Sequence, residues 1–162
     1  MKLLIAFFAA AFLTLIAPDA HAQDTFVFAG ASLTLPDGWK TETSGNMATL
    51  YPPAKGGFIE VYNFSKLPAA SADTILKMLK PRKNTTDISV KDVRPMKFGS
   101  TTGLGASGKA KIKDAPVSFV LTAIPTGSHA VLAIGFLGDT QPVAFKQEVA
   151  RVLGSLKVAA AK

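Results

Sequence analysis

The chain has 162 residues, a formal net charge of +7 at neutral pH and no cysteine. This length fits one compact domain, and the absence of cysteine excludes disulfide bonds, thiolate metal ligands and a cysteine nucleophile. No aromatic residues are interleaved among the lysines, which argues against a nucleic-acid-binding surface despite the basic charge.

The first 22 residues have the three parts of a secretory signal peptide. Lys2 supplies the positive charge, Leu3 to Ala17 form a fifteen-residue apolar run, and Ala20-His21-Ala22 matches the cleavage pattern. Fifteen residues of helix span about 22 Å, too little for a hydrocarbon layer of about 30 Å, so we expect no transmembrane anchor after cleavage. We therefore predict a signal peptide at 1–22 and a single domain at 23–162. Export without cysteine indicates a bacterial periplasmic or secreted protein.

Short strands dominate the first part of the predicted domain. Gly30 separates the first two strands, and Pro36-Asp37-Gly38 is a strong turn signal before Trp39. A loop with two prolines and two glycines, Pro52 to Gly57, joins the last two strands as a hairpin connection. The predicted strands are Phe26–Phe28, Ser32–Leu35, Lys40–Thr43, Met47–Tyr51 and Phe58–Phe64.

A helix interrupts the strands, and a meander of strands follows. Ser71 or Asp73 can cap a helix that extends to Lys80 with one apolar stripe. The extended segments that follow are Ile88–Phe98, Lys109–Lys113, Val117–Ile124 and Ala130–Leu137.

A second helix is predicted after the meander. Asp139 or Thr140 can cap it, and its apolar residues recur at helical spacing: Phe145, Val149, Val152, Leu153 and Leu156. This order of elements predicts an α+β protein in which two helices pack on an antiparallel sheet, an αβ sandwich.

The segment Gly103 to Ala110 matches two phosphate-binding patterns, G-x-G-x-x-G and G-x-x-x-x-G-K. A phosphate loop requires a buried strand before it and a helix after it, whereas the residues after Gly108 alternate as a strand. Ala110 also lacks the hydroxyl that would hold magnesium. We therefore predict a glycine-rich bend that leads into the meander, and no nucleotide site.

No catalytic constellation is visible in the sequence. His129 is the single histidine after the predicted signal peptide, and the carboxylates are scattered without close pairs. We predict no enzymatic activity, no catalytic or metal-binding residue and no cofactor. A hydrolase built on His129 or on two distant carboxylates remains the less favoured alternative.

Basic residues are the main polar signal. Four lie on or just after the first helix: Lys77, Lys80, Arg82 and Lys83. The candidate interaction surface consists of Arg94, Lys97, Lys109, Lys111 and Lys113, which would attract an acidic envelope protein, an anionic envelope polymer or lipid head groups. The alternative is that these residues only keep the protein soluble.

A second hypothesis is a carrier of a small apolar ligand. The ligand would lie between the sheet and the helix Ser71 to Lys80, in a cavity lined by Phe58, Tyr62 and Met78.

Several short motifs resemble the PsbP-like and DcrB-like superfamily. They are the opening strand and turn Ser32 to Trp39, the apolar strand Phe58 to Phe64, the glycine-bearing segment Gly103 to Gly108, the two hairpins, and the closing helix Phe145 to Lys157 with its Leu-Gly-Ser-Leu ending. The resemblance covers Phe26 to Lys157 and implies an antiparallel sheet with helices against it. Members include a lumenal photosystem subunit, a small-GTPase binder, effector chaperones and bacterial envelope proteins. It therefore implies a non-enzymatic binding or accessory protein and assigns no catalytic residue.

Overall fold

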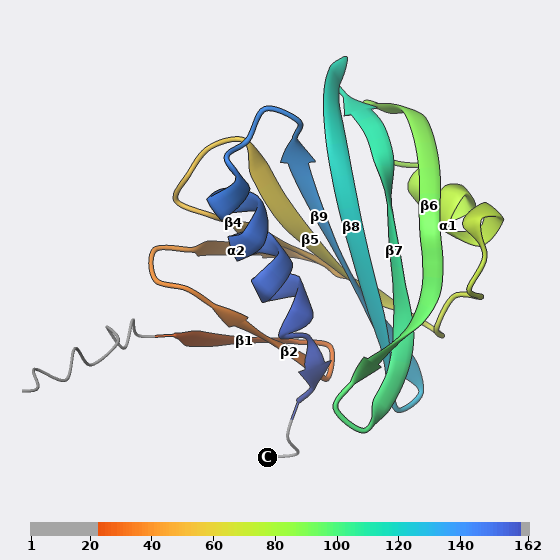
Figure 1. The fold of residues 1–162 in the computed structure, drawn as a ribbon. Helices are drawn as coiled ribbons and strands as arrows, with labels where there is room; N and C mark the ends of the chain where they lie inside the picture. Colours follow the sequence, from red (N-terminus) through yellow and green to blue (C-terminus); the bar gives the residue numbers. More distant parts are fainter. Residues whose placement is uncertain (1–22, 160–162) are drawn as a thin grey trace, which may run out of the picture.

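The computed structural model describes residues 23–159, and the predicted signal peptide, Met1 to Ala22, lies outside them. Within the described residues, ten strands and two helices follow one another along the chain (Figure 1). They are β1 (Asp24–Phe28), β2 (Ala31–Leu35), β3 (Lys40–Ser44), β4 (Met47–Tyr51), β5 (Gly57–Phe64), α1 (Ala72–Leu79), β6 (Thr85–Phe98), β7 (Thr101–Ile112), β8 (Ala115–Thr126), β9 (His129–Gly138), α2 (Val143–Gly154) and β10 (Lys157–Val158). Neither helix is long and apolar enough to cross a membrane.

The strands form two antiparallel sheets. The larger has seven strands in the order β3-β4-β5-β9-β8-β7-β6, and the smaller has the order β1-β2-β10. The predicted α+β class, with two helices packed on antiparallel sheet, is confirmed. The sequence pattern did not indicate that the first two strands leave the larger sheet and form a separate one with β10.

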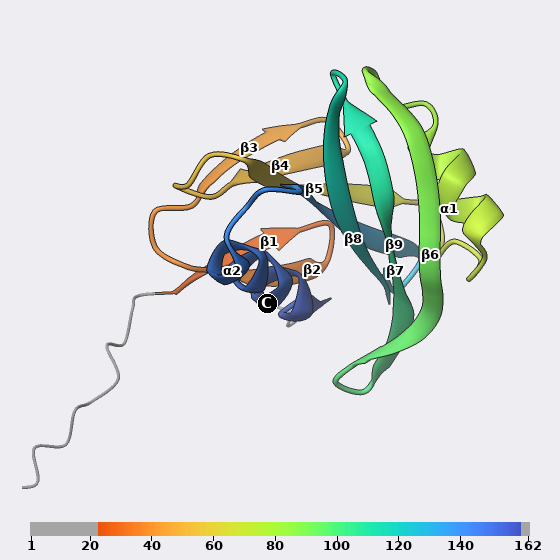
Figure 2. The ribbon, with the colours of Figure 1, turned by 45° about the horizontal axis from the view of Figure 1, so that its top comes forward.

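Each face of the larger sheet is covered by one helix (Figure 2). Side chains alternate across a strand, so Ile59 and Val61 of β5 pack on the face that α2 and the small sheet cover, while Phe58 and Tyr62 lie on the face that α1 covers. We call these the α2 face and the α1 face. Two separate apolar cores result, one on each side of the sheet.

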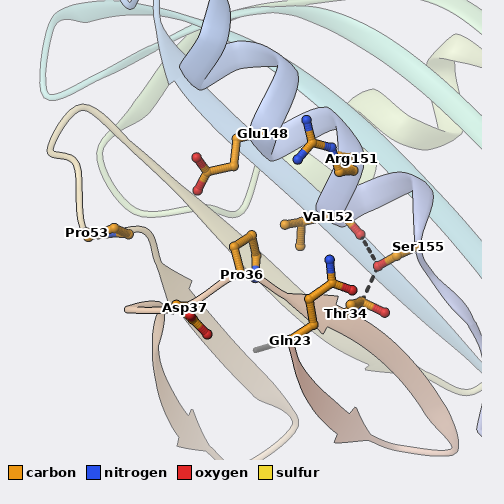
Figure 3. Close-up of a pocket in the computed structure, with 9 residues that line it drawn as sticks. All are labelled: Gln23, Thr34, Pro36, Asp37, Pro53, Glu148, Arg151, Val152 and Ser155. Carbon is orange, nitrogen blue, oxygen red and sulfur yellow. Dashed lines mark hydrogen bonds between the residues drawn. The ribbon is translucent and has the colours of Figure 1, made fainter. Parts of the chain in front are cut away.

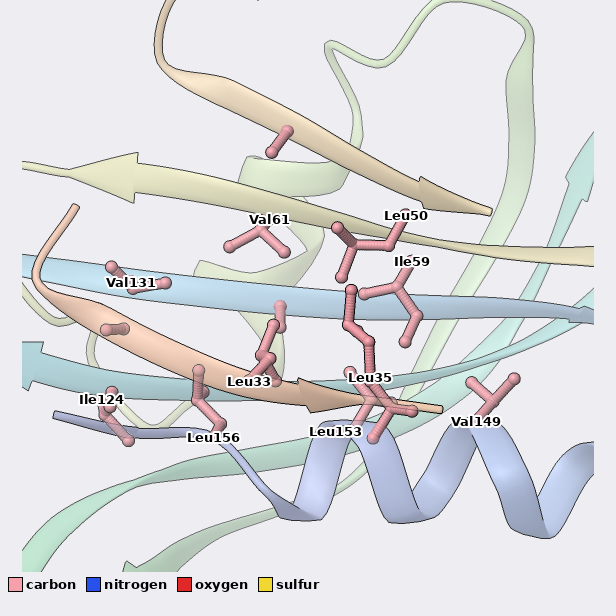
Figure 4. Close-up of a cluster of buried hydrophobic side chains, with 14 of the residues drawn as sticks. Leu33, Leu35, Leu50, Ile59, Val61, Ile124, Val131, Val149, Leu153 and Leu156 are labelled. Carbon is pink, nitrogen blue, oxygen red and sulfur yellow. The ribbon is translucent and has the colours of Figure 1, made fainter. Parts of the chain in front are cut away.

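The core on the α2 face is built from the apolar stripe that the sequence predicted for the last helix (Figure 4). Val149 and Leu153 of α2 are fully buried, and Leu156 packs beside them just after the helix ends. Gly135 of β9 makes the close approach feasible, because a Cβ there would lie 2.9 Å from both Leu153 Cδ1 and Val149 Cγ1.

The predicted cap of α2 is wrong. The helix begins at Val143 with Pro142 at the N-cap and no side-chain cap, not at Asp139 or Thr140. Proline disfavours helical geometry at the residue before it, so the helix cannot extend back through Gln141. The Asp139 carboxylate instead accepts a hydrogen bond from the Ser118 hydroxyl at 2.8 Å. The first helix does begin as predicted, because Ser71 Oγ accepts the Thr74 N–H at 3.2 Å.

The predicted glycine-rich bend from Gly103 to Gly108 is also wrong, since these residues lie inside the long strand β7. Glycine is required there by close packing and not by a turn. A Cβ on Gly103 would lie 2.0 Å from the Ala123 carbonyl oxygen, and one on Gly108 would lie 2.1 Å from the Ser89 carbonyl oxygen. Because Ala110 continues the strand, no helix follows the glycines, and the rejection of a phosphate loop stands.

Candidate functional site

A groove of about 600 Å³ opens on the α1 face, between the β4–β5 loop and the β7–β8 hairpin. Phe58 and Phe136 form its floor, and both belong to the core on the α1 face. We call it the α1-face groove. It is lined by Tyr51, Pro52, Ala54, Lys55, Gly56, Gly57, Phe58, Ile112, Ala115, Pro116, Val117, Phe136, Gly138 and Gln141.

The loop that forms one wall of the groove is fastened to the sheet. The Gly138 N–H donates a hydrogen bond to the Gly56 carbonyl oxygen at 2.9 Å. Gly56 has a φ of +111°, which favours glycine, and the Gln141 side chain fills the space where a Cβ would lie. The wall is therefore held in place, with its two prolines adding stiffness.

The floor of the groove is aromatic and continues into the interior. The ring centroids of Phe58 and Phe136 are 5.2 Å apart, and those of Phe136 and Phe119 are 6.2 Å apart. At the rim, Tyr51 is a large apolar side chain with 38% of its surface exposed. An exposed aromatic beside a fixed apolar trough is the kind of surface that recognises another protein.

A largely buried ion pair lies beside this floor, on the same face of the sheet. The guanidinium of Arg82 lies 4.4 Å from the centre of the Phe136 ring and forms an ion pair with Glu60 of β5. Arg82 Nη2 donates to Glu60 Oε1 at 2.8 Å, and Nη1 donates to the Tyr62 hydroxyl at 2.8 Å. Tyr62 in turn donates to Glu60 Oε2 at 2.5 Å. The two charged side chains are only 15% and 11% exposed, so this cluster is largely shielded from solvent.

Burial changes the acid–base properties of the cluster. It lowers the pKa of Arg82 to about 10, which leaves the guanidinium charged at neutral pH. It raises the pKa of Tyr62, so the hydroxyl keeps its proton and donates to Glu60. The cluster is therefore a charge-compensated structural support at neutral pH.

Sequence reasoning counted Arg82 with the basic residues near the first helix and did not predict its burial. Its partner, Glu60, was not singled out at all. The sequence did contain an indication of this. Glu60 is a charged residue on the same side of the strand as the aromatic residues Phe58, Tyr62 and Phe64. A buried carboxylate requires a partner, although the sequence does not say which cation supplies it.

The five residues of the candidate interaction surface do not lie together on one surface. Arg94, Lys109 and Lys111 point to the α2 side of β6 and β7. Lys97 lies on the opposite side, where its Nζ donates to Thr102 Oγ1 at 2.6 Å. Lys113 lies beyond the strand, in the two-residue turn that joins β7 to β8.

One of these lysines has an acidic partner. Lys111 Nζ lies 2.7 Å from Asp87 Oδ2, and this hydrogen bond raises the pKa of Lys111. The charge of Lys111 is therefore locally compensated. Arg94, Lys109 and Lys113 have no ion-pair partner within residues 23–159.

The three residues of the predicted ligand cavity line two different spaces. Tyr62 and Met78 line a small pocket of about 230 Å³ beneath α1. Phe58 is on the same face of the sheet but lines the α1-face groove instead. The largest space around these three residues is thus the open groove and not an enclosed cavity under the helix.

His129 lies exposed at the start of β9, with its Nδ1 2.9 Å from the hydroxyl oxygen of Ser128. In the part of the chain that the structure describes, no hydrogen bond joins the imidazole to a carboxylate. The same part contains no group of three or more potential metal-ligating His, Cys, Asp or Glu side chains.

No protein-family model matches the chain, and no curated protein matches it in sequence. Solved structures do match its fold. The cyanobacterial PsbP protein of Synechocystis aligns with a TM-score of 0.63 and 8% identity, over 86% of this chain and 94% of that one. The Ran-binding protein Mog1p of Saccharomyces cerevisiae aligns with a TM-score of 0.58 and 10% identity, over 86% and 96%.

A crystal structure from Bacteroides thetaiotaomicron aligns with a TM-score of 0.54 and 16% identity, covering 84% of this chain. The chain spans about half the length of that protein, namely 48%. At these identities the likeness concerns the fold. The PsbP-like resemblance seen in the sequence is confirmed at that level.

Proposed function

We propose that this chain is an exported, non-enzymatic accessory protein that binds another protein of the bacterial envelope through the α1-face groove. The observation that carries the proposal is the groove itself, about 600 Å³ of space over an aromatic floor, with Tyr51 exposed at its rim. Its loop wall is already fastened in the unbound chain, which lowers the ordering cost of binding. The PsbP and Mog1p matches support the fold on which such a surface is built.

The basic residues give the proposed interaction a salt-dependent part. Lys55 lines the groove, and Lys113 lies in the turn between Ile112 and Ala115, which both line it. A partner seated in the groove would therefore meet two lysines, so we propose an acidic rim on that partner. Arg94 and Lys109 point to the other side of the sheet and would act only on a separate anionic component, such as a polymer or lipid head group.

Export is part of the proposal. The first described strand, β1, begins at Asp24, so a cut after Ala22 would remove no residue of any described strand or helix. The domain would therefore keep its complete sheet after processing.

Site-directed photocrosslinking in the cells that export the protein tests this function. A photoreactive phenylalanine analogue replaces Tyr51 at the groove rim or Val143, which is 70% exposed at the start of α2 and does not line the groove. We expect one or a few discrete protein adducts from position 51 and none of the same size from position 143. The same adducts from both positions, or none from position 51, would overturn the proposal.

A further inference from the structure

A second cavity, of about 560 Å³, lies between α2 and the turn that joins β2 to β3 (Figure 3). Pro36 of the turn and Pro53 of the β4–β5 loop form one wall, and α2 forms the other. Proline fixes the local backbone, and the two loops lie close together, since a Cβ on Gly38 would lie 3.6 Å from Pro53 Cγ. This size is within the range of small-molecule sites.

The cavity contains a carboxylate in a fixed position. The indole N–H of Trp39 donates to Glu148 Oε1 at 2.8 Å, which ties the turn to α2. No other described residue forms an ion pair or a side-chain hydrogen bond with Glu148, so its second oxygen is free to accept from a ligand. Figure 3 shows this carboxylate on the side of the cavity that faces Pro53.

Two further charged side chains line the same space. Asp37 projects from the turn, on the opposite side of Pro36 from Glu148 in Figure 3. Arg151 follows Glu148 by three residues on α2, which places Glu148 and Arg151 on one side of the helix. Neither Asp37 nor Arg151 forms an ion pair within residues 23–159. By contrast, the Ser155 hydroxyl is already satisfied, because it accepts the Thr34 N–H at 2.8 Å and donates to the Val152 carbonyl at 2.7 Å.

We propose that this cavity binds a small zwitterion, a free amino acid or a short peptide. The ligand's ammonium group would pair with Glu148, and its carboxylate would pair with the Arg151 guanidinium, which matches a carboxylate with two parallel donors. The apolar surface of Pro36, Pro53 and Val152 would contact the remainder of the ligand. Charges of both signs, unpaired around one rigid apolar space, favour this class over a purely cationic or purely anionic ligand.

The test uses Trp39, because it is the single tryptophan of the chain and therefore gives one indole N–H signal. The exported protein is titrated with L-leucine and L-alanyl-L-alanine up to about 10 mM, and the indole signal and tryptophan fluorescence are followed. Two analogues, N-acetyl-L-alanyl-L-alanine and L-alanyl-L-alaninamide, each lack one of the two charges. We expect a saturable shift with at least one zwitterion and about tenfold weaker binding of both dipeptide analogues.

Variants separate the two charge contacts. Glu148→Gln and Arg151→Gln should each weaken binding about tenfold, while Glu42→Gln on exposed β3 and Lys77→Gln on α1 should leave it unchanged. Arg151 is exposed, so its substitution tests the site without disturbing the core. No saturable shift with either zwitterion, or equal binding of the singly charged analogues, would overturn the proposal.

Discussion

Glu60 and Arg82 show how a single buried charge depends on its partner. Removing one member of a buried ion pair leaves the other uncompensated, which costs about 3–5 kcal/mol, whereas replacing both costs much less. We therefore expect Glu60→Gln and Arg82→Met each to lower the free energy of unfolding by about 3 kcal/mol. The double variant should lose at least about 1 kcal/mol less than the sum of the two.

Urea denaturation of the three variants and the parent completes this double-mutant cycle. Strictly additive losses would show that the two side chains act independently, contrary to the ion pair and the hydrogen bonds that join them.

Tyr62 gives a pH signature of the same cluster. Burial raises its pKa in the folded chain, whereas an unperturbed tyrosine has a pKa of about 10. The folded state therefore holds this proton more tightly, and the stability that Tyr62 contributes is present below pH 10 and is lost as the pH rises through the folded pKa.

Ultraviolet absorbance of tyrosinate measures this effect. Titrations of the parent and of the Tyr62→Phe variant identify the ionisation of Tyr62 by difference. Its midpoint should lie at higher pH in the folded protein than in the urea-denatured protein. Coincident steps in the two states would contradict the burial of this hydroxyl.

The glycines of β7 allow this strand to pack closely against its neighbours, and this close packing can be tested by substitution. Gly103→Ala would place a methyl group on the Ala123 backbone, and neighbouring strands cannot move apart without losing ladder hydrogen bonds. We expect it to lower the free energy of unfolding by about 2–3 kcal/mol. Gly154→Ala is the matched control, because nothing lies within 4 Å of its Cβ position, and the helix should be unchanged or stabilised by up to about 1 kcal/mol.

Thermal and urea denaturation compare the two alanine variants. Equal stability of Gly103→Ala and Gly154→Ala would mean that β7 tolerates side chains there and that its glycines have another role.

A helix or strand could be predicted from the sequence where the contacts that determine it join residues close together in the chain. Val149, Leu153 and Leu156 have helical spacing, and they do form the buried stripe of the last helical segment. The start of that helix was missed because Pro142 overrides the potential caps before it. The glycines of β7 were misread as a bend because the atoms that require them belong to the neighbouring strands.

At the scale of the whole molecule, the fold class followed from the order of elements, but the α1-face groove did not. The groove exists because β5 pairs with β9 and so brings Phe58 opposite Phe136. This pairing joins strands far apart in the chain, and no local pattern encodes it. Sequence reasoning placed Phe58 in a predicted ligand cavity and Pro52 to Gly57 in a hairpin connection, yet it could not place them beside the β7–β8 hairpin.

Export predicts where the amino terminus of the processed protein lies. The protein recovered from the periplasm or medium should begin at Gln23, one residue before β1. Mass spectrometry of the intact protein and of its N-terminal peptide measures this directly. Recovery of a chain that retains residues 1–22 would contradict cleavage after Ala22.

The central claim is that the α1-face groove binds a partner protein. The most direct test is the affinity of the crosslinked partner for the purified protein with Tyr51→Ala or Val143→Ala, two truncations of exposed side chains that add no charge. The account predicts at least about tenfold weaker binding for Tyr51→Ala and no change for Val143→Ala. Equal affinities for the two variants would contradict it.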